Sequence, residues 1–204
     1  MLWYQSIPSW FQKLFPNLIW QLPGSDSKDV YLTFDDGPHP DISLWVAGQL
    51  EKHQMKGTFF CVGDNVRKYP ETAEMLIQKG HRLGNHTMHH LKGWNTDKQI
   101  YTSDVEACAS YVSSPLFRPP YGRISREQIK LLKMKYRIIM WSILSCDFDR
   151  SLKPESALEG LFKKTRNGSI VVFHDSLKAE KNLKYMLPRY LEFLNENGFI
   201  CKTL

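Results

Sequence analysis

The sequence lacks the features that mark several specialised classes of protein. No internal repeat and no low-complexity segment occurs in its 204 residues, and no stretch reaches the roughly 18 apolar residues of a membrane-spanning helix. The four cysteines form no C-x-x-C pair, which argues against a zinc knuckle or a redox motif. We therefore expect a globular chain with reduced, structural cysteines and no transmembrane segment, long enough for one domain and short for two.

Runs of positive charge are also missing. The chain has 27 Lys and Arg against 21 Asp and Glu, which gives a formal charge of +6. The basic residues are scattered, and none stand in the runs that are typical of a polyanion-binding site. We expect a solvated basic surface, no nucleic-acid partner and, for the oligomeric state, a monomer.

The first twenty residues have neither a basic leader nor a continuous apolar core, so they do not resemble a secretory signal. This favours a cytoplasmic location, with association with the cell envelope left open. The segment is rich in aromatic residues, which favour a cap packed over one end of the domain or, alternatively, contact with a membrane interface. We expect residues 1–28 to form the cap; its aromatic residues are Trp3, Trp10, Phe11, Phe15 and Trp20.

Short β-rich runs alternate with helical stretches along the rest of the chain. This alternation predicts an α/β fold with parallel strands, either an open doubly wound sheet or a (β/α) barrel. In both, functional residues gather at the carboxyl ends of the strands. The candidate strands are residues 30–34, 57–62, 81–85, 116–118, 137–141, 169–174 and 199–203. The first candidate helix is capped by Asp41 or Ser43 and ends near Lys52. The others span residues 70–79, 97–111 with Thr96 as its cap, 125–135 with Ser125 at its start, 154–164 and 182–197.

Two acids follow the first candidate strand, in the run Thr33-Phe34-Asp35-Asp36-Gly37-Pro38. Adjacent carboxylates repel each other and burial adds to the cost, so a bound cation would relieve both effects. Taken alone, the two acids could instead cap backbone groups of a turn.

Two histidines, His86 and His90, follow the third candidate strand. Their spacing of four places them on one face of a helix, as in known zinc motifs, and they could also converge from a loop. The alternative is a surface loop that is rich in histidine, with His89 as another member.

One carboxylate and two imidazoles make a three-ligand site with open positions. Catalytic zinc sites are often built in this way, and so are those of mononuclear Fe(II) oxygenases. The second acid favours hydrolysis, because hydrolysis needs a base beside the attacking water. His174, at the end of a later candidate strand, would then serve as the acid.

The order TFDDGP, H-T-x-x-H, R-P-P-Y and a strand ending in His spans residues 31–174. In this order the chain resembles the polysaccharide deacetylases, the NodB-like domains of carbohydrate esterase family four. The resemblance implies a distorted (β/α)7-8 barrel in one domain at residues 29–204. It also implies a metal-dependent hydrolase that removes N-acetyl or O-acetyl groups from a sugar or polysaccharide, such as a GlcNAc-containing glycan.

The resemblance also assigns roles to individual residues. By motif position, Asp36, His86 and His90 correspond to the ligands of one divalent metal ion, with Zn2+ favoured over Co2+, Ni2+ or Fe2+.

Four further residues correspond to the groups that act around the metal. Asp35 corresponds to the catalytic base and Arg118 to the residue that orients this base. His174 corresponds to the catalytic acid, and the backbone N–H of Tyr121 would help to stabilise the oxyanion.

The fourth motif departs from the family pattern D-x-x-D-W, since residues 144–148 read Leu-Ser-Cys-Asp-Phe. Asp147 keeps the second acid, where it either tunes His174 or pairs with Arg118. Asp175 is expected to be structural. The altered motif also leaves open a carbohydrate-binding module without turnover, and an amidase acting on a non-sugar C–N bond is a third possibility.

Overall fold

The computed structural model describes residues 5–24 and 26–204, so Trp3 lies outside the described part of the chain. Within that part, the strands form one nine-stranded sheet in which every pair of named strands runs parallel. The strands are β1 (Leu18–Ile19), β2 (Lys28–Asp35), β3 (Thr58–Cys61), β4 (Arg82–Asn85), β5 (Leu116–Phe117), β6 (Arg137–Ile139), β7 (Ile143–Leu144), β8 (Ser169–His174) and β9 (Phe199–Cys201).

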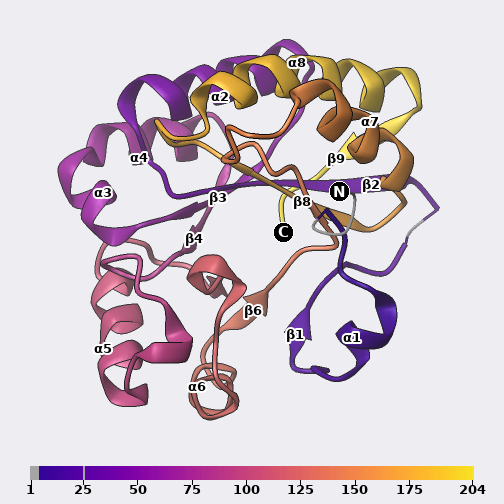
Figure 1. Ribbon diagram of the computed structural model, residues 1–204. Helices are drawn as coiled ribbons and strands as arrows, with labels where there is room; N and C mark the ends of the chain where they lie inside the picture. The colour runs from indigo at the N-terminus through magenta and orange to yellow at the C-terminus, as the bar shows by residue number, and fades with distance from the viewer. Residues whose placement is uncertain (1–4, 25) are drawn as a thin grey trace.

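The sheet curls, and helices cover its outer side (Figure 1). Its strand order is β1-β6-β5-β4-β3-β2-β8-β7, with β9 beside β2. The helices are α1 (Ser9–Lys13), α2 (Pro40–Lys52), α3 (Gly63–Lys68), α4 (Pro70–Gln78), α5 (Lys98–Ala109), α6 (Arg126–Leu132), α7 (Pro154–Lys164) and α8 (Glu180–Glu196). The α/β fold with a distorted (β/α) barrel is confirmed, and the open doubly wound sheet was the wrong alternative. No helix in the described part is long and apolar enough to span a membrane.

The strand β2 shows how side-chain alternation separates the core from the site. Val30, Leu32 and Phe34 belong to the large apolar cluster that includes residues of α2, α7 and α8. Because successive side chains of a strand point to opposite faces, Thr33 and Asp35 point to the other face, the barrel interior. The site therefore starts as the inward-facing half of a strand whose outward half anchors the core.

The N-terminal segment joins the two edges of the curled sheet. On one side β1 pairs with β6, and the Met140 N–H donates to the carbonyl of Ile19 over 2.7 Å. On the other side, isolated antiparallel bridges connect Ser6 with Ile143 and Gln21 with Ser169. Because one side is closed only by such bridges, the barrel is distorted. The predicted boundary between an N-terminal cap of residues 1–28 and the domain of residues 29–204 stays a prediction.

All predicted strands and helices are present, with shifted ends, but the short helices α1 and α3 and the two-residue strands β1 and β7 were missed. Two predictions of helix caps were wrong. The cap of α5 is Asp97, whose carboxylate accepts from Gln99 N at 2.8 Å, since the Thr96 hydroxyl donates to Lys92 O instead.

The cap of α2 is His39, whose Nδ1 accepts from the backbone N–H of Asp41. Asp41 and Ser43, the two predicted caps, lie inside the helix. Ser125 caps α6 as expected, in a capping box with Gln128.

A pair of tryptophans tests whether the N-terminal segment belongs to the core. Trp20 is 7% exposed and packs in a cluster with Leu18, Ile138 and Met140, whereas Trp10 is 66% exposed. We expect Trp20→Ala to lower the free energy of unfolding by about 3–5 kcal/mol and Trp10→Ala to change it by no more than about 0.5 kcal/mol. Chemical denaturation measures both, and equal effects would contradict this packing.

Candidate metal centre and active site

The two adjacent acids at the end of β2 point to different partners. Asp35 is the last residue of the strand, and Asp36 turns away from it with a φ of 80°. This conformation is held from two sides, because Asn65 Nδ2 donates to the Asp36 carbonyl over 2.7 Å and the next N–H, of Gly37, donates to Asp175 over 3.1 Å. The turn thus separates two carboxylates that follow each other in the chain.

Asp36 faces the two predicted histidine ligands. Its Oδ1 lies 3.0 Å from His90 Nε2 and 3.7 Å from His86 Nε2. One ligand atom from each residue lies within 4.8 Å of the other two. Burial raises the pKa of the Asp36 carboxyl, but hydrogen bonds from both histidines outweigh burial and hold this pKa well below its usual range. An oxygen and two imidazole nitrogens in this arrangement fit a divalent cation of the zinc type.

The histidines converge from a loop after β4 and not from a helix. His90 and Thr87 both have positive φ angles, of 57° and 64°. His86 is 2% exposed, and its Nδ1 lies 2.8 Å from the carbonyl of Arg118. Because a carbonyl only accepts, this contact fixes the proton on Nδ1 and leaves Nε2 free as a ligand atom.

His89 is excluded from the metal centre by its own partner. Its Nδ1 and its backbone N–H both bind the Asp104 carboxylate. The three histidines of the loop therefore divide into two that face Asp36 and one that ties the loop to α5.

Arg118 follows β5 and is fully buried, with 0% exposure. Its Nη1 donates to Asp35 Oδ1 and to Thr33 Oγ1, both over 2.7 Å. Its Nε and Nη2 donate to the carbonyls of Ile139 and Met140 over 3.3 and 2.9 Å. Burial lowers the pKa of the guanidinium and the Asp35 carboxylate acts against this. Since the ordinary pKa of arginine exceeds about 12, the side chain stays charged and holds Asp35 in place.

The alternative partner for Asp147 is decided by the fold. Its carboxylate accepts from the His174 backbone N–H over 2.8 Å and lies 2.7 Å from His174 Nδ1. Asp147 therefore pairs with His174 and not with Arg118. Burial lowers the pKa of His174, but the charge and hydrogen bond of Asp147, together with the charges of Asp36 and Asp35, outweigh burial and raise this pKa to about 9. The imidazole is therefore protonated at neutral pH.

The position of His174 places this charge beside the acids. In the register of β2 and β8, His174 lies directly across from Asp35. Phe148, at the tryptophan position of the fourth motif, packs edge-on against the His174 ring with the ring centroids 5.0 Å apart.

Two other sequence-selected residues take different places. Asp175 is buried and accepts from Gly37 N and from the Ser43 hydroxyl, which agrees with a structural role. Burial raises the pKa of its carboxyl to about 7. Tyr121 has a φ of 60°, and its largely exposed ring lies 4.8 Å from that of His90.

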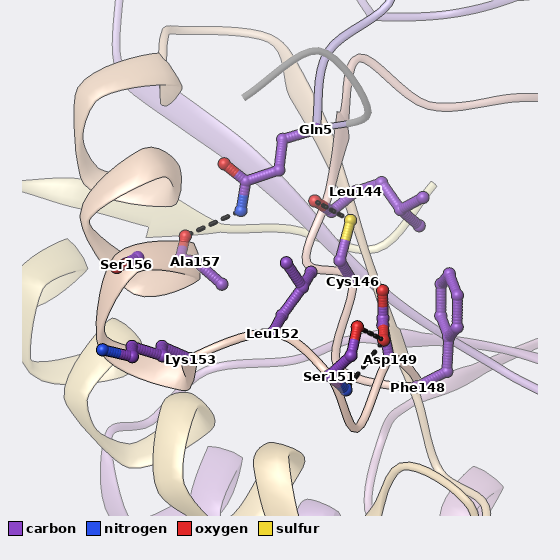
Figure 2. Close-up of a pocket in the computed structure, with 10 residues that line it drawn as sticks. All are labelled: Gln5, Leu144, Cys146, Phe148, Asp149, Ser151, Leu152, Lys153, Ser156 and Ala157. Carbon is purple, nitrogen blue, oxygen red and sulfur yellow. Dashed lines mark hydrogen bonds between the residues drawn. The ribbon is translucent and has the colours of Figure 1, made fainter. Parts of the chain in front are cut away.

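Two hollows adjoin the site. One, of about 470 Å³, has Asp36 and His90 among its lining residues. The other, of about 510 Å³, lies between the N-terminal segment, the loop after β7 and α7. Figure 2 shows its lining, with Gln5 bound to the Ala157 carbonyl, Cys146 beside Leu144, and Phe148 at one edge. The candidate metal ligands Asp36, His86 and His90 lie outside this second hollow.

The sequence reasoning missed the residues that support Arg118. Thr33 accepts from its guanidinium, and the Phe60 ring centroid lies 4.1 Å from its Cζ. Side-chain alternation could have found Thr33, which is two residues before Asp35 on the same face of a strand. Phe60 carries no such signal, because an apolar residue in a strand is ordinarily core.

The fold and the site together define a (β/α) barrel with a candidate metal centre, a buried carboxylate–arginine pair and a histidine–aspartate pair at the carboxyl ends of its strands. The polysaccharide deacetylase family model matches residues 23–137. The chain is 30% identical to a peptidoglycan-N-acetylglucosamine deacetylase of Bacillus cereus over 91% of this chain and 90% of that protein. The chain therefore belongs to the polysaccharide deacetylase family.

Two further comparisons agree. A chitooligosaccharide deacetylase of Azorhizobium caulinodans is 30% identical over 76% of this chain and 78% of that protein. The crystal structure of the Bc1960 peptidoglycan N-acetylglucosamine deacetylase superposes with a TM-score of 0.84 at 24% identity, covering 95% of this chain and 94% of that one. This likeness shows that the fold is shared.

The loop histidines provide a test of the metal centre with a matched control. His86→Ala removes a candidate ligand that faces Asp36, so we expect the variant to bind less divalent metal than the wild-type protein. His89→Ala changes a neighbour in the same loop that binds Asp104, so we expect the metal content to stay at the wild-type level. Elemental analysis after dialysis against zinc measures both, and equal metal content in the two variants would reject His86 as a ligand.

Proposed function

We propose that this protein removes acetyl groups from N-acetylglucosamine units of a glycan, with the aid of one divalent metal ion. The observation that carries the proposal is the separation of Asp35 from Asp36. One carboxylate joins His86 and His90, while its neighbour stays outside that set and is held by Arg118. A hydrolytic site needs both a cation and a free base at one place. The relatives named for sugar deacetylation support the substrate class.

Asp36, His86 and His90 would hold the ion, with zinc as the first choice and cobalt, nickel or iron as alternatives. When bound, a divalent ion there supplies Lewis acidity for the acetyl carbonyl and lowers the pKa of a bound water. The chain keeps the His86 ring in the ligating tautomer through the Arg118 carbonyl.

Asp35 acts as the base in this proposal. Its carboxylate accepts a proton as water attacks the acetyl carbon, and Arg118 fixes its orientation through a 2.7 Å contact. Both members of this pair are buried. Among the described residues, no other acidic group lies at ion-pair distance from Arg118.

His174 acts as the acid. An amine leaves readily only when it is protonated, and the Asp147 carboxylate keeps the imidazole charged at neutral pH. With Nδ1 bound to Asp147, Nε2 carries the proton that goes to the leaving nitrogen. The backbone N–H of Tyr121 would donate to the oxyanion, an interaction worth about 3–4 kcal/mol for a single donor.

The location of the protein stays a prediction. Assembled peptidoglycan lies outside the cytoplasmic membrane. A peptidoglycan substrate would therefore favour association with the cell envelope, which the sequence left open. Free chitooligosaccharides are compatible with the cytoplasmic location.

The base is tested with Asp35→Asn and acetate release from N-acetylglucosamine oligomers and peptidoglycan strands. We expect a loss of roughly 10²–10⁴ in rate, the typical contribution of a general base, with the metal content unchanged. Because the change leaves the buried Arg118 unpaired, stability falls as well, by about 3–5 kcal/mol. Assays are therefore made well below the melting temperature.

A folded Asp35→Asn variant that keeps its metal and the wild-type rate would exclude Asp35 as the base. Absence of metal-dependent acetate release from all of these glycans by the wild-type protein would contradict the proposed function and favour a binding module.

The acid is tested through the pH dependence of kcat/KM. Asp147 helps to raise the pKa of His174 to about 9 against the effect of burial. Asp147→Asn should therefore lower this pKa, and the alkaline limb of the profile should move to lower pH. An aryl acetate provides the control, since its leaving group needs no proton. Equal losses at pH 8 on the glycan and on the aryl ester would contradict the role of His174 as acid.

A further inference from the structure

The hollow beside the metal centre has an uneven charge. Asp36 and His90 line it on the side of the candidate metal centre, and two exposed lysines, Lys68 and Lys178, line it further out together with the exposed Leu177. A glycan bound with an acetyl group at the metal centre would extend into this hollow, because the hollow is continuous with the ligands.

Lys178 is held close to the acid–base groups. Its Nζ lies 5.3 Å from the centroid of the Phe148 ring, and the same ring packs 5.0 Å from that of His174. Only one aromatic ring therefore separates this ammonium group from the proposed acid. A cation over an aromatic face is attracted to the ring, which restrains an otherwise flexible side chain.

The charge of Lys178 is not neutralised by a neighbouring acid. Asp149 is close enough for Lys178 to lower its pKa, but its carboxylate binds the Ser151 hydroxyl and N–H. In the described part of the chain, neither Lys178 nor Lys68 has an acidic group at ion-pair distance.

The acids that line the hollow are engaged elsewhere. Asp64 pairs with Arg67 over 3.0 Å on α3, and Asp36 faces His86 and His90. The outer part of the hollow therefore presents two positive charges to a ligand, in a protein whose formal charge is +6.

We propose that Lys178, assisted by Lys68, binds a carboxylate on the sugar next to the one that is deacetylated. This inference rests on the proposed function and narrows its substrate class. Chitooligosaccharides are uncharged, whereas peptidoglycan strands from which the stem peptides have been removed carry a free lactyl carboxylate on every second sugar. Two lysines at the rim are attracted to such a strand over roughly one Debye length, and they gain nothing from a neutral oligosaccharide.

The experiment compares one glycan in two charge states. Peptidoglycan strands freed of their peptides are used as prepared and after conversion of their carboxylates to methylamides, which keeps length and sugars and removes the charge. Acetate release gives kcat/KM on each strand for the wild-type protein, for Lys178→Gln and for Lys68→Gln. Lys28→Gln is the matched control, because Lys28 also lies over an aromatic ring, at 5.8 Å from Phe199, but at the opposite end of β2 from Asp35.

We expect the wild-type protein to prefer the carboxylated strand and Lys178→Gln to reduce that preference roughly fivefold through KM, the effect of one exposed charge pair. Lys68→Gln should reduce it less, Lys178→Arg should retain it, and Lys28→Gln should leave it unchanged. The preference should also weaken as ionic strength rises. Equal kcat/KM on the two strands, or an unchanged ratio in Lys178→Gln, would overturn the proposal.

Binding separates this proposal from the proposed function. Calorimetric titration of both strands into an Asp35→Asn background, with and without Lys178→Gln, measures the ratio of the two Kd values without turnover. If the wild-type protein releases no acetate, the deacetylase function fails, yet this ratio still decides the lysine site. Tighter binding of the carboxylated strand than of the methylamide strand, with the difference lost in Lys178→Gln, supports the site. Equal Kd values for the two strands reject it.

Discussion

The contact between Arg118 and Asp35 is the interaction on which the site depends. A fully buried guanidinium is costly to remove from water unless its donors are satisfied, and here two carbonyls, a threonine hydroxyl and one carboxylate satisfy them. The carbonyls come from the end of β6 and just beyond it, which is supported in turn by the N-terminal strand β1. The position of one carboxylate therefore depends on strands from both sides of the barrel. The backbone carbonyl of Arg118 also orients His86, so Arg118 connects the proposed base Asp35 with the candidate metal centre.

Backbone conformation directs neighbouring polar side chains to different partners. Asp36, Thr87, His90, Tyr121 and Cys146 all have positive φ angles without being glycine, a conformation that is uncommon and costs roughly 1–3 kcal/mol each. Each lies in a loop that follows a strand of the sheet. Such turns let consecutive side chains point in different directions, as Asp35 and Asp36 do. The same device separates His89, which binds Asp104, from His90, which faces Asp36.

Much of this arrangement could be predicted from the sequence, and the parts that could not be predicted were missed for different reasons. The regular strands β2 and β8 and the long helices α5 and α8 have strong local patterns and were found. The strands β1 and β7 have two residues each, which is too short for a periodic signal, and they exist because neighbouring strands offer unpaired backbone groups. Phe60 and Thr33 were missed because their local sequence is that of an ordinary strand. The choice of Asp147 between His174 and Arg118 could not be made, because it depends on how the loop after β7 folds back over β8.

The sequence by itself determined which chemical groups are present, because the motifs and their order can be read from it directly. It also determined at which end of the sheet these groups gather, because parallel strands place their carboxyl ends together. It also determined the family. The family resemblance implied that Asp36 joins His86 and His90 and that Arg118 orients Asp35, and the tertiary structure shows these contacts. Only the tertiary structure decided that Asp147 pairs with His174 and that Lys178 lies over Phe148. These pairings join residues as far apart in the chain as Asp35 and Arg118. Spacing in a sequence carries no information on such distances, and they are fixed by the curl of the sheet and by the burial cost that each unpaired charge would carry.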